Sequence, residues 1–157
     1  MVLKSSSTAA LGVRPFFYPS TKPVLHCEGV ALDAVAAKFG TPLYVYSAGQ
    51  ILERYRLFSR AFGRRDHLIC YSVKANSNLS ILRLLARAGS GFDIVSGGEL
   101  ERILAVSKAA ARRVVFSGVG KTAPEIDLAL KAGILIFNAE SESEIDLLAG
   151  RARKLGV

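Results

Sequence analysis

The sequence predicts an α/β protein in which parallel strands are covered by helices, and three observations support this fold class. Short apolar runs begin at residues 68, 92, 114 and 134, so 24, 22 and 20 residues separate their starts, the length of one strand–helix unit. A polar turn and an amphipathic helical pattern follow each run. The runs are nearly continuously apolar, which is typical of strands buried on both faces. A (β/α)8 barrel and an open doubly wound sheet both have these properties.

The four expected strands and the helices between them have well-marked ends. Three helix starts carry the capping-box pattern, in which a Ser or Thr is followed three residues later by Glu; they are Ser96–Glu99, Thr122–Glu125 and Ser141–Glu144. Asn78 or Ser77 is expected to cap the helix after the first strand. Gly89, Gly133 and Gly150 stand where the helices are expected to end. The expected strands are Leu68–Val73, Phe92–Val95, Val114–Phe116 and Ile134–Phe137.

Upstream of these units we expect a flexible tail, residues 1–23, and a leading segment, residues 24–65, before the barrel-type domain of residues 66–157. The leading segment reads as a short helix, a strand and a long helix. Their expected positions are Gly29–Phe39, Leu43–Tyr46 and Ala48–Phe62.

Composition excludes several classes of function. The 157 residues carry a net charge of +8, but their basic residues are scattered and not interleaved with aromatics, so no nucleic-acid partner is expected. No apolar run is long enough to cross a membrane. The two cysteines lack metal-ligand spacing and fit a reducing cytoplasm. The Ser-rich, acid-free start, Met1–Thr21, leaves a plastid transit peptide as the alternative.

Lys74 is the first candidate functional residue. It ends a strand-like run and precedes a helix, and a lysine is costly to bury unless a partner or a chemical task holds it there. Alternation along a strand would place Cys70, Ser72 and Lys74 on one face. A desolvated lysine amine can be neutral and nucleophilic, as Schiff-base chemistry requires. The alternative is a lysine that extends from a strand end into solvent.

Asp93 is the second candidate. It lies within an apolar strand, and alternation places it on the face opposite Phe92 and Ile94. If that face points inward, Asp93 lies on the strand beside that of Lys74, where a carboxylate could hold the ammonium group or orient an imine. A structural ion pair between the same two residues is the alternative.

Two other motifs do not support a site. Residues 118–122 end in Gly-Lys-Thr like a phosphate-binding loop, but the full motif needs a glycine where Val115 stands, which excludes ATP binding. His26, Cys27 and Glu28 are adjacent on an extended segment and point in different directions, so no metal site is predicted. His67 is expected at the surface.

Several stretches resemble a known family. Tyr71–Asn76, with the sequence Tyr-Ser-Val-Lys-Ala-Asn, and Phe92–Leu100, which contains Ser-Gly-Gly-Glu, resemble the fold-type III pyridoxal-phosphate-dependent decarboxylases. Phe116–Thr122 and Phe137–Ser141 are similar to the diaminopimelate decarboxylase branch of that family. The resemblance covers residues ~24–157 and includes the leading segment.

The resemblance implies a (β/α)8 TIM-type barrel with pyridoxal 5'-phosphate at the carboxyl ends of its strands. It implies that Lys74 is the catalytic, cofactor-binding Schiff-base lysine and Asp93 the neighbouring cofactor-binding carboxylate. The implied reaction is the decarboxylation of meso-diaminopimelate to L-lysine and CO2, in lysine biosynthesis, by a homodimer.

Four strand–helix units cannot close an eight-stranded barrel, so we expect the chain to hold the N-terminal half only. The family's cofactor-stacking histidine, glycine-rich phosphate loop and pyridine-nitrogen glutamate have no counterpart here, and the chain is expected to be inactive alone. The alternatives are a non-catalytic decarboxylase-like binding protein and another fold-type III enzyme, such as an ornithine or arginine decarboxylase or an alanine racemase-like protein.

Overall fold

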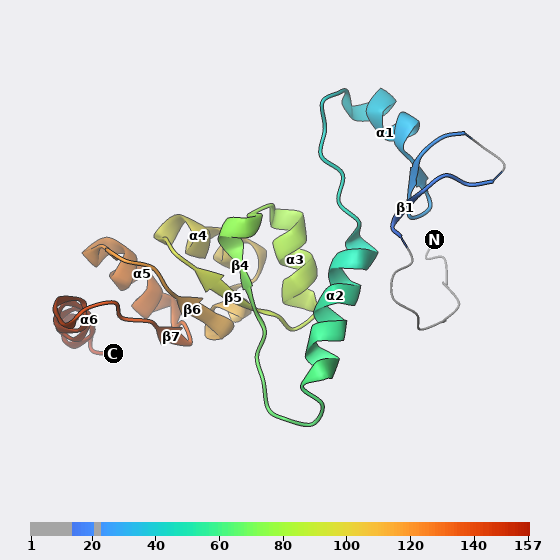
Figure 1. The fold of residues 1–157 in the computed structure, drawn as a ribbon. Coiled ribbons are helices and arrows are strands. Elements are labelled where there is room, and N and C mark those ends of the chain that lie inside the picture. Colours follow the sequence, from blue (N-terminus) through green and yellow to red (C-terminus); the bar gives the residue numbers. More distant parts are fainter. Residues whose placement is uncertain (1–13, 21–22) are drawn as a thin grey trace. The chain divides into compact units, whose positions relative to one another are not determined.

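A computed structural model describes residues 14–20 and 23–157 and divides the chain into two compact units, Met1–Glu53 and Arg54–Val157 (Figure 1). Residues 1–13 and 21–22 of the expected tail lie outside the described residues. The domain boundaries expected at residues 23 and 65 stay a prediction. Each unit is described by itself.

The second unit contains one parallel sheet of four strands, which lie side by side in chain order, β4-β5-β6-β7 (Figure 1). All four strands predicted from the apolar runs are present. The two outer strands, β4 and β7, are shorter than predicted. Each pairs with one neighbour only, and the strand extends no further than that pairing. The strands are β4 (Cys70–Ser72), β5 (Gly91–Ile94), β6 (Val114–Phe116) and β7 (Ile136–Phe137).

The helices of this unit begin at the predicted caps. The side chains of Asn78, Ser96 and Ser141 accept hydrogen bonds from first-turn amides. Gly133 ends α5 in the left-handed conformation. The predicted end at Gly150 is wrong: α6 continues to Leu155, since a helix interior tolerates one glycine at about 1 kcal/mol. The elements are η1 (Val73–Ala75), α3 (Leu79–Arg87), α4 (Gly97–Val106), η2 (Lys108–Arg113), α5 (Ala123–Ala132) and α6 (Glu142–Leu155).

The order of the strands decides between the two architectures that the sequence left open. Because each strand pairs with the next one in the chain, right-handed connections carry every helix to the same side of the sheet. Consecutive helices accordingly contact each other, α3 with α4, α4 with α5 and α5 with α6. A doubly wound sheet would reverse its strand order and place helices on both sides. The second unit is therefore a segment of a barrel wall.

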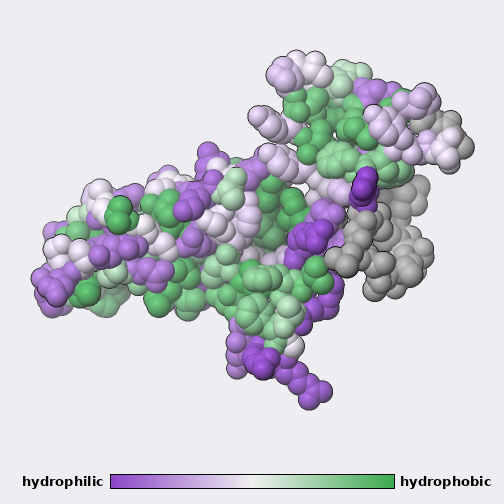
Figure 2. Space-filling view, viewed as in Figure 1, coloured by the Kyte–Doolittle hydropathy of each residue, from purple (hydrophilic) through white to green (hydrophobic). Residues whose placement is uncertain are grey.

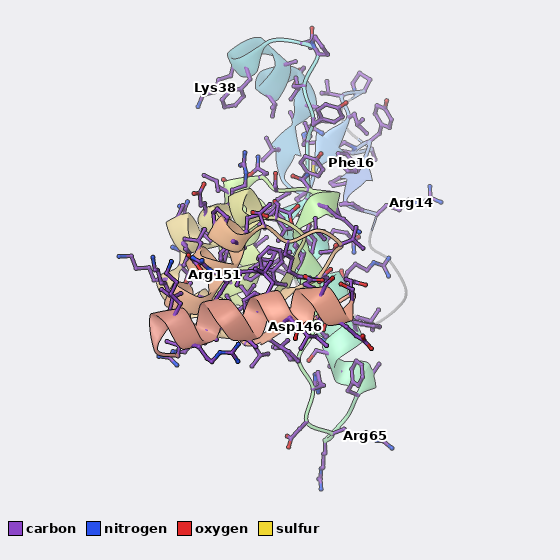
Figure 3. The ribbon with its side chains drawn as sticks, turned by 90° about the vertical axis from the view of Figure 1, so that its left-hand side faces the viewer. Arg14, Phe16, Lys38, Arg65, Asp146 and Arg151 are labelled. Carbon is purple, nitrogen blue, oxygen red and sulfur yellow. The ribbon has the colours of Figure 1, made fainter. Side chains whose placement is uncertain are left out.

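The last two helices are also joined by an ion pair. Arg151 of α6, which is labelled in Figure 3, donates from Nε to Asp127 Oδ1 of α5 at 2.6 Å, and a second bond joins Nη2 to Oδ2. This paired geometry holds the pKa of the Asp127 carboxyl below its usual range.

The two faces of the sheet differ in burial. Phe92, Ile94, Val114 and Phe116 point under the helices and have no exposed surface. The side chains on the other face, including Cys70 and Asp93, are partly exposed. Figure 2 shows hydrophobic residues exposed along the lower side of this unit, over β6 and β7. The core of the unit lies between sheet and helices, and the opposite face of the sheet is open.

Removing the largest core side chain should test this assignment. Phe116→Ala is expected to lower the free energy of unfolding by about 3–5 kcal/mol, because it removes a fully buried ring that stacks against Phe137. Val119→Ala, at a position 84% exposed, is the matched control and should change it by less than about 0.5 kcal/mol. Urea unfolding followed by circular dichroism measures both, and equal effects would contradict the assigned core.

The first unit begins with a small antiparallel sheet, ordered β1-β2-β3 and followed by α1. The strands are β1 (Phe16–Phe17), β2 (His26–Cys27) and β3 (Val30–Ala31), and the helix is α1 (Leu32–Phe39). Phe16 and Phe17, which lie within the expected tail, form β1, since their aromatic side chains favour strand pairing with β2. The helix expected from Gly29 begins later, because Val30 and Ala31 pair with β2.

The strand predicted at Leu43–Tyr46 is absent from the described residues of this unit. A strand needs a hydrogen-bonded neighbour, and none lies beside this segment; Tyr44 is 91% exposed and Tyr46 53% exposed. The long helix that follows, α2 (Ala48–Ala61), ends one residue before its predicted limit. Across the described residues, no helix is both long and apolar enough to span a membrane.

Candidate active site

Lys74 lies on the turn η1, between β4 and α3, and its side chain is exposed. The strand ends at Ser72, so the prediction that Lys74 continues the face of Cys70 and Ser72 is wrong. The chain turns there because Val73 buries its side chain completely. Hydrogen bonds stabilise the turn: Tyr71 Oη donates to the Asn76 carbonyl at 3.1 Å, and Asn76 Oδ1 accepts from the Asn78 amide at 3.0 Å. Lys74 thus presents an exposed amine from an ordered turn at the carboxyl end of β4.

Asp93 lies on β5, on the face opposite the buried Phe92 and Ile94, as predicted. The parallel register places it beside Ser72, two residues before Lys74. Its Oδ1 accepts a hydrogen bond from Ser117 Oγ at 2.6 Å. The structure does not join Asp93 to Lys74 directly; the ion pairs within the described residues are Lys121–Glu144 and Arg151–Asp127. The second carboxylate oxygen of Asp93 accepts no hydrogen bond from the described part of the chain.

Ser117 and Asn138 complete a row of polar side chains that sequence reasoning missed. Ser117 follows β6, Asn138 follows β7, and Asn138 Nδ2 donates to Ser117 Oγ at 3.0 Å. The row Asp93–Ser117–Asn138 therefore crosses the carboxyl ends of three adjacent strands, where barrel enzymes place their active sites. The signal that could have revealed Ser117 and Asn138 is positional, since each comes directly after an apolar strand that ends in phenylalanine.

Cys70 lies on the same face but is not a candidate nucleophile. Burial, together with the negative charge of Asp93, raises the pKa of the Cys70 thiol, so the thiol stays protonated near neutral pH. Its sulfur packs over Gly91, where an added Cβ would lie 2.6 Å from Sγ and 2.7 Å from the Arg113 carbonyl oxygen. Gly91 is thus required by close approach of the chain.

Lys121, the lysine of the rejected phosphate-loop motif, is buried and has a structural environment. Its Nζ donates to the carbonyls of Gly118 and Asn138, at 2.8 and 2.7 Å, and to Glu144 Oε1 at 2.6 Å. Three acceptors use all three N–H groups of the ammonium. Sequence reasoning did not anticipate this burial.

Two capping-box glutamates join neighbouring loops at this edge of the sheet. Glu125 Oε1 accepts from the Gly97 amide at 2.8 Å, while Oε2 accepts from the amide and hydroxyl of Thr122. Glu144 binds Lys121 and, through Oε2, the Glu140 amide at 3.0 Å. The amide of Gly97 lowers the pKa of Glu125, and the ammonium of Lys121 lowers the pKa of Glu144.

These lowered pKa values predict acid sensitivity. A carboxyl whose pKa is lower in the folded than in the unfolded chain stabilises the fold above its unfolded pKa, here about 4.5, and loses this contribution as pH falls through the folded pKa. The free energy of unfolding should therefore decrease as pH falls below about 4.5. Glu125→Gln should be less stable at pH 7 and show a shallower decrease.

Urea unfolding between pH 7 and pH 3, with the exposed Glu101→Gln as matched control, measures this dependence. An undiminished slope in Glu125→Gln would show that Glu125 does not contribute to it.

Comparison with known proteins shows which family this chain is similar to. Residues 48–156 match the family model "Pyridoxal-dependent decarboxylase, pyridoxal binding domain". Diaminopimelate decarboxylase of Pseudomonas aeruginosa is 53% identical over 133 residues, which cover 85% of this chain and 32% of that protein.

Two solved structures superpose on this fold. Diaminopimelate decarboxylase from M. jannaschii has a TM-score of 0.84 at 37% identity, covering 90% of this chain and 33% of that one. The Helicobacter pylori enzyme complexed with L-lysine has a TM-score of 0.75 at 46% identity, covering 80% of this chain and 32% of that one.

The fold and the strand-end residues define an α/β-barrel domain with an exposed lysine and a row of polar side chains at the carboxyl edge of its sheet. The chain belongs to the pyridoxal-dependent decarboxylase family, within the pyridoxal-binding domain. It spans about a third of the length of the relatives it matches, and its second unit is the N-terminal part of a TIM-type barrel. The predicted resemblance and fold class are thereby confirmed.

Proposed function

We propose that this chain supplies the cofactor-binding lysine of a diaminopimelate decarboxylase, which converts meso-diaminopimelate to L-lysine and CO2. The observation that carries the proposal is the exposed amine of Lys74 just after β4, two residues beyond Ser72, whose partner on β5 is Asp93 with its anchored carboxylate. An aldehyde cofactor needs an accessible primary amine, and a nearby carboxylate favours positive charge on that nitrogen. The residues present therefore fit the aldehyde end of pyridoxal phosphate.

In this proposal Lys74 holds the cofactor by a covalent bond from Nζ. Asp93 stabilises positive charge at this edge of the sheet through the carboxylate oxygen that Ser117 leaves free. Ser117 and Asn138 keep that carboxylate oriented. The bound cofactor supplies an electron sink for the pair of electrons left when CO2 departs.

The comparisons favour diaminopimelate over the alternative substrates. Curated diaminopimelate decarboxylases are 46–55% identical to this chain, and the Helicobacter pylori relative was solved with L-lysine, the product expected here. The lysine/ornithine decarboxylase of Vibrio vulnificus is only 22% identical and supports the fold alone.

The remaining proposals concern the complete protein. We infer a homodimer that works in the cytoplasm, in lysine biosynthesis, with neither nucleic acid nor membrane as a partner. Its scattered basic residues support the absence of a nucleic-acid partner: Arg113, for example, donates to the carbonyls of Ser90 and Ala86. Boundaries near residues 23 and 65 would divide tail, leading segment and barrel.

Covalent trapping tests the role of Lys74. The 157-residue chain is incubated with pyridoxal phosphate, reduced with borohydride, digested and analysed by mass spectrometry. Labelling at Lys74 should exceed labelling at the exposed Lys131 by at least about tenfold, a preference of 1.4 kcal/mol. Lys131 is the matched control because it is also exposed but lies on α5 and not at a strand end. Equal labelling of the two lysines would overturn the assignment.

A further inference from the structure

Lys121 occupies an unusual place for a charged residue. It is 6% exposed, and its ammonium is enclosed by Glu144 and two backbone carbonyls. Glu144, 8% exposed, uses its other oxygen to accept from the Glu140 amide. We name this arrangement the Lys121 clamp: Lys121, Glu144 and the carbonyls of Gly118 and Asn138. The clamp joins the loop after β6 to the loop after β7.

The two carbonyls held by the clamp belong to Asn138 and to Gly118, the neighbour of Ser117. Gly118 directly follows Ser117, which donates to Asp93, and Asn138 itself donates to Ser117. Main-chain bonds hold the other side of each residue, from the Ser117 amide to Ile94 and from the Asn138 amide to Phe116. The backbone position of both donors is therefore fixed from two sides, by the sheet and by Lys121.

We propose that Lys121 is a positioning residue for the Asp93 carboxylate, acting through Ser117 and Asn138. This inference rests on the proposed function, since it gives Asp93 its role beside Lys74. Lys121 does not donate to Asp93 itself, because its N–H groups are bound to Glu144 and to the carbonyls of Gly118 and Asn138. It sets the separation of the two loops, and that separation sets the direction from which Ser117 meets Asp93.

Stability alone does not account for a buried lysine here. Replacing a buried ion pair with apolar side chains of similar volume is often neutral or stabilising. The Lys121 ammonium lies 5.6 Å from the centroid of the Phe116 ring, but its hydrogen-bond partners are polar, so Lys121→Met leaves the Glu144 carboxylate and two carbonyls without their donor. The effect of Lys121 on position is therefore measured only in variants that remain folded, which separates positioning from stability.

The experiment uses isotope-labelled 157-residue chain and compares Lys121→Met with Lys131→Met, an exposed lysine of the same loop–helix unit. Nuclear magnetic resonance reports the Asn138 side-chain amide and the Asp93 carboxyl, under conditions where circular dichroism shows both variants folded. Lys121→Met should move both resonances and slow borohydride-trapped labelling of Lys74 by about fivefold. Lys131→Met should do neither.

A second variant covers the case in which Lys121→Met does not fold. Glu144→Gln keeps an oxygen for Lys121 but removes the charge, and it should move the same resonances by a smaller amount. Unchanged Asn138 and Asp93 resonances in the folded variant would overturn the inference. Failure of the wild-type chain to label at Lys74 would instead overturn the proposed function, while the resonances still decide whether Lys121 positions Asp93.

Discussion

Lys74→Ala is expected to abolish decarboxylation in a chimera in which this chain replaces the matching third of the Pseudomonas aeruginosa enzyme. The two sequences are 53% identical over that third, so the barrel should form with the residues of this chain at the site. Alanine removes the only atom of residue 74 that can bond covalently to the cofactor. Losing the covalent group of a catalytic site lowers kcat by about 10⁴-fold or more.

Release of CO2 from meso-diaminopimelate measures the effect, and the visible absorption of bound cofactor should disappear with it. Lys131→Ala in the same chimera is the control and should retain both. Circular dichroism should show the same fold for all three proteins, because the side chain of Lys74 is exposed and contributes no packing. A Lys74→Ala chimera with a reducible cofactor adduct on another lysine would show that residue 74 has been misassigned.

The second large effect concerns the 157-residue chain by itself, which should release no measurable CO2 from meso-diaminopimelate, even with pyridoxal phosphate added. The site face of its sheet is open, with Asp93 and Ser117 partly exposed, so solvent weakens their electrostatic effect. The glycine-rich phosphate loop and the pyridine-nitrogen glutamate that the family resemblance implies have no counterpart in this sequence. Each missing interaction lowers the rate tenfold for every ~1.4 kcal/mol of lost transition-state stabilisation.

Side-by-side assays of the isolated chain and the active chimera, at equal concentration, make this comparison. The outer strands β4 and β7 each pair on one side only, and exposed strand edges favour association, so light scattering should accompany the assay. Turnover by the isolated chain within about a hundredfold of the chimera would show that residues 14–157 hold more of the machinery than we infer.

The fold was predictable where local chemistry dominates. Strand–helix spacing and Ser or Asn caps depend on residues close in sequence, and Asn78, Ser96 and Ser141 cap as expected. The prediction of a strand at Leu43–Tyr46 is wrong, because its aromatic composition favours a strand only where a neighbouring strand is available for pairing. The prediction that the last helix ends at Gly150 is wrong, because a glycine only weakens a helix and α6 packs on α5 beyond that residue.

The two candidate residues of the site, Lys74 and Asp93, could be selected from the sequence, but the side chains that hold Asp93 in place could not. Alternation placed Asp93 on the open face because its neighbours in sequence are apolar. Ser117 and Asn138 could not be paired with it from sequence, because three different strands contribute to the row. In the sequence, Lys121 stands out only as part of an incomplete phosphate-binding loop motif. Its burial depends on Glu144, 23 residues away, which that motif does not include.

The capping glutamates have a consequence for how the chain is made. Glu125, at the start of α5, holds the Gly97 amide that opens α4, and Glu144, at the start of α6, holds Lys121 ahead of α5. Each helix start is thus secured by a residue that leaves the ribosome more than twenty residues later. During translation, we expect every strand–helix unit to remain loosely closed until its successor has been synthesised. Stable folding would then proceed from the N-terminus, with each strand–helix unit completed only when the following unit has been synthesised.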